Sequence, residues 1–408
     1  MKYLVRIFFF FLPLWGPGGL VSGQELKDYL QIAAQNNPEV KAAYAEFEAS
    51  MQKLPQVSSL PDPTLSVSPF GMMETKMGPQ KATFELMQMF PWFGTLKARK
   101  SEAALLAEAK FQEYLDVRNR LLYEVSAKYY ELFSLEEKID FQEDNLRILE
   151  DFKELSLAKV SAGSGLLTDV LKVELLQDEM LSAIKILELE RKPLLAEFNA
   201  LLNRESNSEV EIPEELEMPS ENIIPSKNGI SEEHPRIQIF KKRESAARAG
   251  KLIAQKNGLP QIGVGIEYMV IGQPDMNMEN AGKDAIMPMF QVTLPIFRKK
   301  YKAAEKEAEF MQESFAQRKI ATVNSLETEY ENALFGLERI KEQLELYQRQ
   351  VKSTGEILNL SLSYYQNAKL SFEEVLRLQQ EFLRLNLAEA EAKSEYFTLL
   401  AKIDYLVN

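Results

Sequence analysis

The chain has 408 residues, with 48 Lys and Arg against 61 Asp and Glu, and its formal net charge of −13 argues against nucleic acid as a partner. It has no cysteine and a single histidine, His234, which excludes disulfides, thiolate metal sites, a cysteine nucleophile and sites built from several histidines. We interpret the many carboxylates as solvated helix surface rather than a hydrolytic pair, so the sequence predicts neither an enzyme nor a cofactor.

Residues 1–23 have the pattern of a secretory signal peptide. Lys2 and Arg6 precede or open a short apolar run that contains Pro and Gly, and small residues follow it. We predict cleavage near Gly23 and export from the cytoplasm. The alternative, an uncleaved membrane anchor, requires about twenty apolar residues, more than this run supplies.

The rest of the chain forms two copies of one pattern, residues 24–203 and 227–408, joined by a linker over 204–226 that is rich in Glu, Pro, Ser and Asn. Each copy opens with a helix, predicted over residues 26–54 and 231–257. Within each copy we also predict a helix start directly after a proline, at Glu39 after Pro38 and at Arg236 after Pro235, because proline is suited to a helix's first turn. We interpret His234 as a helix-start residue.

Two alternating runs follow each opening helix and indicate strands with one apolar face. In the second copy this face is formed by Ile262, Val264, Ile266, Tyr268 and Val270. Each pair of runs ends at a proline, Pro91 or Pro295, before a long charged stretch. Because proline lacks the donor that a sheet requires and fixes φ for a helix's first turn, we predict that both prolines are strand–helix junctions.

Two long segments without proline, residues 95–160 and 298–367, predict single helices on the order of 100 Å long. Their apolar residues recur every seven residues, which indicates left-handed coiled packing. In the second helix they are Val323, Tyr330, Leu337, Leu344, Val351, Leu358 and Tyr365. Each long helix reverses at a tip and returns as a helix about half as long, over 166–202 and 371–407. A return helix stacked on an opening helix matches one long helix, so we expect a tall helical cylinder.

Strands of about ten residues with one apolar face suit the wall of an outer-membrane barrel. Four strands cannot close a barrel, because membrane barrels have about eight or more and an open edge in lipid leaves backbone groups unpaired. The chain is therefore expected to oligomerise, with Trp92, Phe93 and Phe297 at the membrane boundary. The alternative is a soluble hairpin packed on one face, within a periplasmic coiled-coil scaffold that forms no channel.

The duplicated order of helix, hairpin, proline junction, long helix, tip and return helix resembles that of the TolC-like outer-membrane efflux proteins, over nearly the whole mature chain. The family's tip pattern is Tyr-x-x-Gly-x-x-Ser-x-x-Asp-Val-Leu. The second copy matches it, with the glycine and aspartate replaced, at Tyr365, Ala368, Ser371, Glu374, Val375 and Leu376. The first copy retains Gly163, Asp169, Val170 and Leu171.

The resemblance implies a mixed fold: a long α-helical coiled-coil barrel across the periplasm, joined to a transmembrane β-barrel to which each protomer of a homotrimer contributes four strands. It implies a passive outer-membrane duct of a tripartite efflux or export system. Its partners would be a periplasmic adaptor protein, an inner-membrane pump and outer-membrane lipid. The pump selects the cargo in such systems, so drugs, metal cations such as copper or silver, and polypeptides all stay open.

The resemblance also implies a periplasmic gate at the tips. Tyr365, Asp169 and Glu374 match residues that hold or line the closed entrance. Where the family's best-known member has an arginine that bonds toward the first-copy aspartate, this chain has Leu370, with Lys369 adjacent. A second acidic position of that member corresponds to Arg377.

Most of the 15 methionines gather in or near the hairpins, and thioethers are soft ligands for Cu(I) and Ag(I). The alternative is that these side chains fill strands and loops as apolar groups. The methionines concerned are Met72, Met73, Met77, Met87, Met89, Met269, Met276, Met278, Met287 and Met289.

Overall fold

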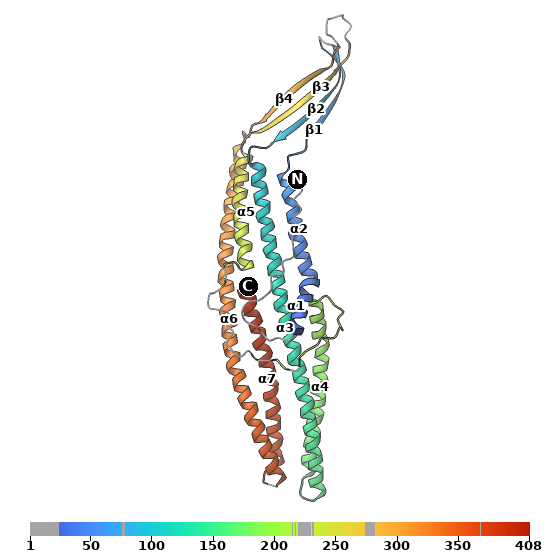
Figure 1. The fold of residues 1–408 in the computed structure, drawn as a ribbon, viewed down its shortest axis with the longest axis vertical. Coiled ribbons are helices and arrows are strands. Elements are labelled where there is room, and N and C mark those ends of the chain that lie inside the picture. Colours follow the sequence, from blue (N-terminus) through green and yellow to red (C-terminus); the bar gives the residue numbers. More distant parts are fainter. Residues whose placement is uncertain are drawn as a thin grey trace. The chain divides into compact units, whose positions relative to one another are not determined.

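The computed structural model describes residues 24–75, 78–213, 215–216, 218, 230, 232–273, 282–367 and 369–408. The predicted signal peptide and part of the predicted linker lie outside the described residues. In chain order the elements are α1 (Gln24–Asn36), α2 (Pro38–Ser58), β1 (Thr64–Thr75), β2 (Gly78–Phe90), α3 (Thr95–Ser161), α4 (Leu167–Leu201), α5 (Pro235–Asn257), β3 (Gln261–Ile271), β4 (Ala285–Thr293), α6 (Arg298–Gln366) and α7 (Phe372–Val407) (Figure 1).

Both predicted long helices occur, as α3 with 67 residues and α6 with 69. The helix start predicted at Glu39 is confirmed to within a residue, because α2 begins at Pro38. The single span predicted over 26–54 is wrong, because it breaks between α1 and α2. The N–H of Asn37 closes the last turn of α1 on the carbonyl of Ala33 at 2.9 Å, and Pro38 has no N–H with which to continue the ladder. The second opening helix begins at Pro235, within a residue of the start predicted at Arg236 and not at the first residue of the predicted span 231–257. The Nδ1 of His234 caps it by accepting from the N–H of Arg236 at 3.2 Å.

The chain divides into two compact units, and each unit takes segments from both copies of the pattern. Unit 1 comprises Met1–Pro38, Arg118–Ser231 and Glu327–Asn408, and unit 2 comprises Glu39–Val117 and Glu232–Leu326. The opening helices α2 and α5 belong to unit 2, whereas the return helices α4 and α7 belong to unit 1. The helices α3 and α6 contribute their first parts to unit 2 and their second parts to unit 1.

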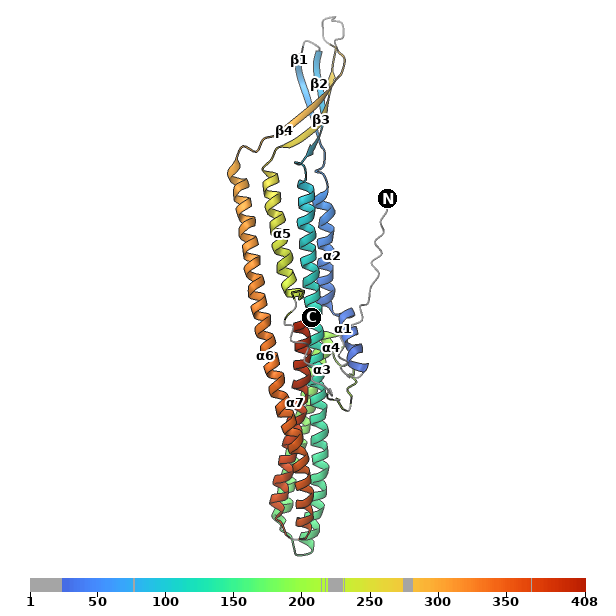
Figure 2. The same ribbon diagram turned by 60° about the vertical axis from the view of Figure 1, so that its left-hand side comes forward.

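Unit 2 places its helices in the order α2, α3, α5, α6, side by side (Figures 1 and 2). Ion pairs join neighbouring helices: Lys110 to Glu46 at 2.8 Å, Lys242 to Glu108 at 2.6 Å, and Lys251 to Glu309 at 2.8 Å. Such partly exposed pairs contribute about 0–1 kcal/mol each. The three pairs connect α2 to α3, α3 to α5 and α5 to α6.

The sheet of unit 2 is antiparallel, with four strands in the order β1-β2-β3-β4. The two copies meet at the β2–β3 pair, where Leu86 lies opposite Ile266 and Phe84 opposite Tyr268. The edge strands are β1 and β4, and each has one side without a strand partner in the described part of the chain. Proline occurs inside both edge strands, at Pro69 and Pro288, which is where a sheet tolerates a missing donor.

Unit 1 packs the second parts of α3 and α6 with α4, α7 and α1. The predicted seven-residue seam is buried for most of its length in α6: Tyr330, Leu337, Leu344, Leu358 and Tyr365 are each less than 9 % exposed. In α3, Val125 and Leu132 are completely buried. This confirms the heptad interpretation for the part of each long helix that lies in unit 1.

No helix among the described residues is both long enough and apolar enough to span a membrane.

Candidate functional site: the helix tips and the sheet

The tip between α3 and α4 is a tight reversal that depends on two glycines. Gly163 adopts a positive φ of 72°, the left-handed conformation that favours glycine at a helix C-terminus. The N–H groups of Ser164 and Gly165 both donate to the carbonyl of Lys159, at 2.9 and 3.0 Å. A β-carbon on Gly165 would lie 2.9 Å from the backbone nitrogen of Val160, which is too close to accommodate. Both positions of the first-copy tip therefore favour glycine.

Tyr365 lies near the end of α6, inside the apolar cluster that holds the two tips of unit 1 together. Its side chain is 6 % exposed, and its ring centroid lies 5.0 Å from that of Phe372. The Nζ of Lys159, from the last turn of α3, lies 3.7 Å from the centre of the Tyr365 ring and donates to the Tyr365 carbonyl at 2.6 Å. One lysine thus joins the ends of α3 and α6 by a cation–π contact and a charge-assisted hydrogen bond.

Asp169 lies near Tyr365, as the resemblance implies. Burial raises the pKa of the Tyr365 phenol, an interaction with the Ser156 hydroxyl opposes that shift, and the negative charge of Asp169 adds to it. The phenol therefore stays protonated at neutral pH and is available as a donor. Asp169 itself occupies the first turn of α4, where a negative charge is favoured by the helix dipole.

Glu374 is engaged differently from the other two gate candidates. Both of its oxygens accept from Arg377, at 3.1 and 2.6 Å, within the exposed first turns of α7. The hydrogen bond from Arg377 lowers the pKa of Glu374. The structure thus brings Tyr365 and Asp169 together and pairs Glu374 with the basic residue that replaces the second acidic position. Leu370 packs against the apolar cluster instead of forming a polar contact.

Lys159 is the functional candidate that the sequence analysis missed. Its position in the last turn of α3 carries a general signal, because cations there interact with free carbonyls and the helix dipole. That signal does not say that the carbonyl belongs to α6. The contact joins residues that are 206 positions apart, so only the packing of the two helices reveals it.

The two prolines lie between strand and helix, as predicted. Pro91 follows β2, which ends at Phe90, and precedes α3; Pro295 follows β4, which ends at Thr293, and precedes α6. Aromatic side chains cluster beside them. Phe93 and Phe297 are each 77 % exposed, and Trp92 contacts Phe93 with ring centroids 5.9 Å apart. These exposed aromatic rings are the residues expected at a membrane boundary.

One face of the sheet is an exposed apolar surface. Residues directly opposite in an antiparallel register share a face, and the register puts the predicted apolar residues of all four strands together. Phe290 is 80 % exposed and Leu65 63 %. The exposed members of this apolar face are Leu65, Val67, Phe84, Leu86, Phe90, Ile262, Val264, Ile266, Tyr268, Ile286, Phe290 and Val292. A large uncovered patch of this kind marks an interaction surface.

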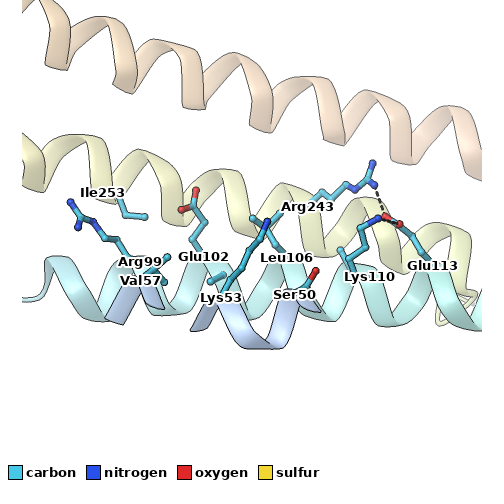
Figure 3. A pocket seen from close by; sticks show the side chains of 12 residues that line it. Ser50, Lys53, Val57, Arg99, Glu102, Leu106, Lys110, Glu113, Arg243 and Ile253 are labelled. Carbon is cyan, nitrogen blue, oxygen red and sulfur yellow. Dashed lines mark hydrogen bonds and ion pairs between the residues drawn. The ribbon is translucent and has the colours of Figure 1, made fainter. Parts of the chain in front are cut away.

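A cavity of about 460 Å³ lies among α2, α3 and α5 of unit 2. Figure 3 shows Lys110 and Arg243 converging on Glu113 at one end of it. Glu102 lines the same cavity, and burial raises the pKa of its carboxyl group. Within the described residues no group of three or more histidine, cysteine or carboxylate side chains could hold a metal ion. Apart from the ion pairs of Glu113, the lining consists of apolar side chains and the polar groups of Ser50, Lys53, Arg99 and Glu102, which form no nucleophile–base pair.

Residues 229–407 match the model of a family described as outer membrane efflux protein. This part of the chain is similar to that family. The match covers the second copy of the pattern, which includes β3, β4, α6 and the second-copy tip. Among curated proteins none is similar to the chain in sequence.

Solved structures extend the likeness to nearly the whole chain. CusC superimposes with a TM-score of 0.81 at 17% identity, covering 97% of this chain and 95% of its own. The outer membrane protein VceC from Vibrio cholerae gives 0.76 at 16%, covering 94% and 95%. The open state of the MtrE outer membrane channel from Neisseria gonorrhoeae gives 0.75 at 18%, covering 94% and 88%. At these identities the likeness shows the fold, which is that of the outer membrane efflux proteins in both copies.

Proposed function

We propose that the protein is the outer-membrane duct of a tripartite efflux or export system, extending into the periplasm. The observation that carries the proposal is the match of residues 229–407 to the outer membrane efflux protein family. That family consists of channels, not enzymes. The duct supplies a passage and no chemistry, and the conduit is completed by an inner-membrane pump and a periplasmic adaptor protein.

The sheet supports a position in the outer membrane. Its apolar face is uncovered over all four strands, and the exposed side chains include Leu65, Ile266 and Phe290. A soluble scaffold would cover such a face, because about 25 cal/mol is lost for each Å² of apolar surface left in water. The two edge strands also need partners in lipid. A homotrimer meets both needs, with twelve strands closing one barrel and the aromatic residues beside Pro91 and Pro295 at its boundary.

The helices would form the periplasmic part of the duct. Residues 24–203 and 227–408 are the two repeats, with the linker over 204–226 between them. Return helices stacked end to end with opening helices beside α3 and α6 would give the cylinder. The gate would be the tips, where Lys159 and Asp169 surround Tyr365. Lys159 takes the place of the arginine that this chain lacks, and Glu374 contributes through its pair with Arg377.

Purified protein tests the proposal directly. In mild detergent it is expected to be a monodisperse trimer that retains its β-sheet signal, and in planar bilayers it is expected to conduct ions. The double substitution Tyr365→Phe and Asp169→Ala should raise the single-channel conductance, because it removes a hydrogen-bonding hydroxyl and a charge at every tip. A monodisperse monomer with intact β-sheet signal, or trimers that conduct nothing in either form, would overturn the proposal.

A further inference from the structure

The face of the sheet opposite the apolar face carries methionines. The register places Met87 of β2 opposite Gly265 of β3, and Gly265 opposite Met289 of β4. The next pair on the same face sets Met89 opposite Gly263. We call this surface the methionine face. Met77, Met276 and Met278 lie outside the described residues, as do the side chains of Met72 and Met73.

Two thioethers converge over the central glycines of β3. A β-carbon on Gly263 would lie 2.6 Å from the Sδ of Met89 and 3.1 Å from the Sδ of Met87. The two sulfurs therefore cannot be farther apart than the sum of these distances. The Met87 Sδ would also lie 3.0 Å from a β-carbon on Gly265. The glycines leave the space in which the sulfurs meet, and Met87 is only 8 % exposed as a result.

An unusual pair of carboxylates lies beside the sulfurs on the same face. Glu85 of β2 is directly opposite Glu267 of β3, and Glu267 is opposite Met287 of β4. Like charges directly opposite each other destabilise a sheet. In the part of the chain that the structure describes, neither carboxylate forms an ion pair or a hydrogen bond that would offset the repulsion. A bound cation would offset it.

Apolar filling does not explain this arrangement. The apolar side chains of these strands are on the other face, and the methionine face otherwise holds residues such as Ser66, Gln291 and Thr293. A hard divalent cation does not explain it either, since such ions require several oxygen ligands. Thioethers are soft ligands that select Cu(I) and related ions. They are neutral, so a site built from them needs nearby negative charge.

We propose that the methionine face binds a soft monovalent cation, Cu(I) or Ag(I), through the sulfurs of Met87 and Met89. Met289, directly opposite Gly265, is a further methionine on the same face, and the carboxylates of Glu85 and Glu267 supply the compensating charge. The site itself depends only on the sheet. Its position on the inner wall of a duct, and with it a role in metal export, rests on the proposed function.

Silver is the suitable probe, because the chain has no cysteine to compete for it. The full-length protein, purified in detergent, is dialysed against Ag(I) in nitrate buffer and the bound metal is measured. The test variant is Met87→Leu with Met89→Leu, which conserves volume. The matched control is Met51→Leu with Met311→Leu, two exposed helix methionines in the same unit.

The wild type and the control are expected to bind Ag(I) alike, with sulfur neighbours in X-ray absorption spectra. The test variant should bind at least about tenfold more weakly, since removing even an outer partner of a metal site costs that much. Equal binding by the test variant and the control, or absorption spectra without sulfur neighbours, would overturn the inference.

Gly263→Ala provides a second variant, which keeps every methionine and decides the matter if the leucine variant does not fold. Its methyl group would occupy the place of the Met89 sulfur, and a flexible thioether can move away without disrupting the strand. Weaker Ag(I) binding supports the inference, and unchanged binding overturns it. If the protein binds silver but forms no conducting trimer, the proposed metal site stands and the proposed duct function is refuted. Failure of the metal site and failure of the duct function therefore give different results.

Discussion

Replacing Lys159 by methionine tests whether this side chain holds the two tips together. The substitution retains the aliphatic stem and removes the ammonium group, which lies 3.7 Å from the Tyr365 ring centre and donates to the Tyr365 carbonyl at 2.6 Å. A partly desolvated cation–π contact contributes about 0.5–2 kcal/mol and a hydrogen bond to a charged group about 1.5–3 kcal/mol. Because one nitrogen serves both contacts and loses its hydration, we take a net value of about 2 kcal/mol.

That loss should appear as faster local opening. About 2 kcal/mol corresponds to about a 30-fold faster amide hydrogen exchange where exchange follows local opening. The amides to follow are those of Gly165 and Lys369, which donate to the carbonyls of Lys159 and Tyr364 at the two tips. Amides in the middle of α3 should be unaffected.

Lys172→Met is the matched control at the same tips. Lys172 pairs with Glu373 at 3.1 Å, but its side chain is 48% exposed and that of Glu373 80% exposed. A pair this exposed contributes about 0–1 kcal/mol, so exchange should change by less than about fivefold. If the amides of Gly165 and Lys369 exchange no faster in the Lys159→Met variant than in the Lys172→Met variant, the ammonium of Lys159 does not hold the tips together and the reasoning fails.

Two further predictions concern unit 2. Val264→Lys puts a charge on the exposed apolar face, at a cost of about 2–4 kcal/mol at the middle of a bilayer. This variant should form no heat-modifiable trimers in membranes, whereas the control variant Pro91→Ala should still form them. Equal trimer yields from the two variants would contradict the lipid-facing assignment. Burial raises the pKa of Glu102 above its ordinary 4.5, so the folded chain holds this proton more tightly than the unfolded chain, and stability falls as pH rises through that range. Glu102→Gln should therefore raise the thermal midpoint near pH 7.5 and leave it unchanged near pH 3; an equal shift at both values would show that burial of the charge is not the cause.

The sequence predicted the regular elements well because their signals are local. Proline-free heptads predicted α3 and α6 to within a residue at each end, and alternation predicted which strand residues form the apolar face. The sequence predicted a helix start after Pro38 and also one continuous helix over 26–54, because a proline in a helix's first turn and one that separates two helices look alike in sequence.

The candidate sites were less predictable because they depend on pairing between distant segments. Alternation alone does not reveal that Met87 and Met89 meet over Gly263, since β2 and β3 come from different copies and their register is a tertiary property. Lys159 and Tyr365 are likewise joined only by packing. The family pattern indicated Tyr365 and Asp169 and showed Leu370 in place of the arginine, but it gave no indication that Lys159 of α3 contacts Tyr365.

The central claim is that β1 of one protomer pairs with β4 of the next protomer until three protomers close a barrel. This pairing can be tested by cross-linking. The chain has no cysteine, so single cysteines can be introduced on β1 at Leu65 or Val67 and on β4 at Phe290 or Val292. Within one chain, β1 and β4 are separated by two strands, or about 14 Å across the sheet, which no disulfide spans. A disulfide between a cysteine on β1 and one on β4 must therefore join two protomers. With one cysteine on each edge, mild oxidation of native outer membranes should give a covalent ladder that ends at three chains in at least one register. Monomers alone in every register, or a ladder that continues beyond three, would contradict the account.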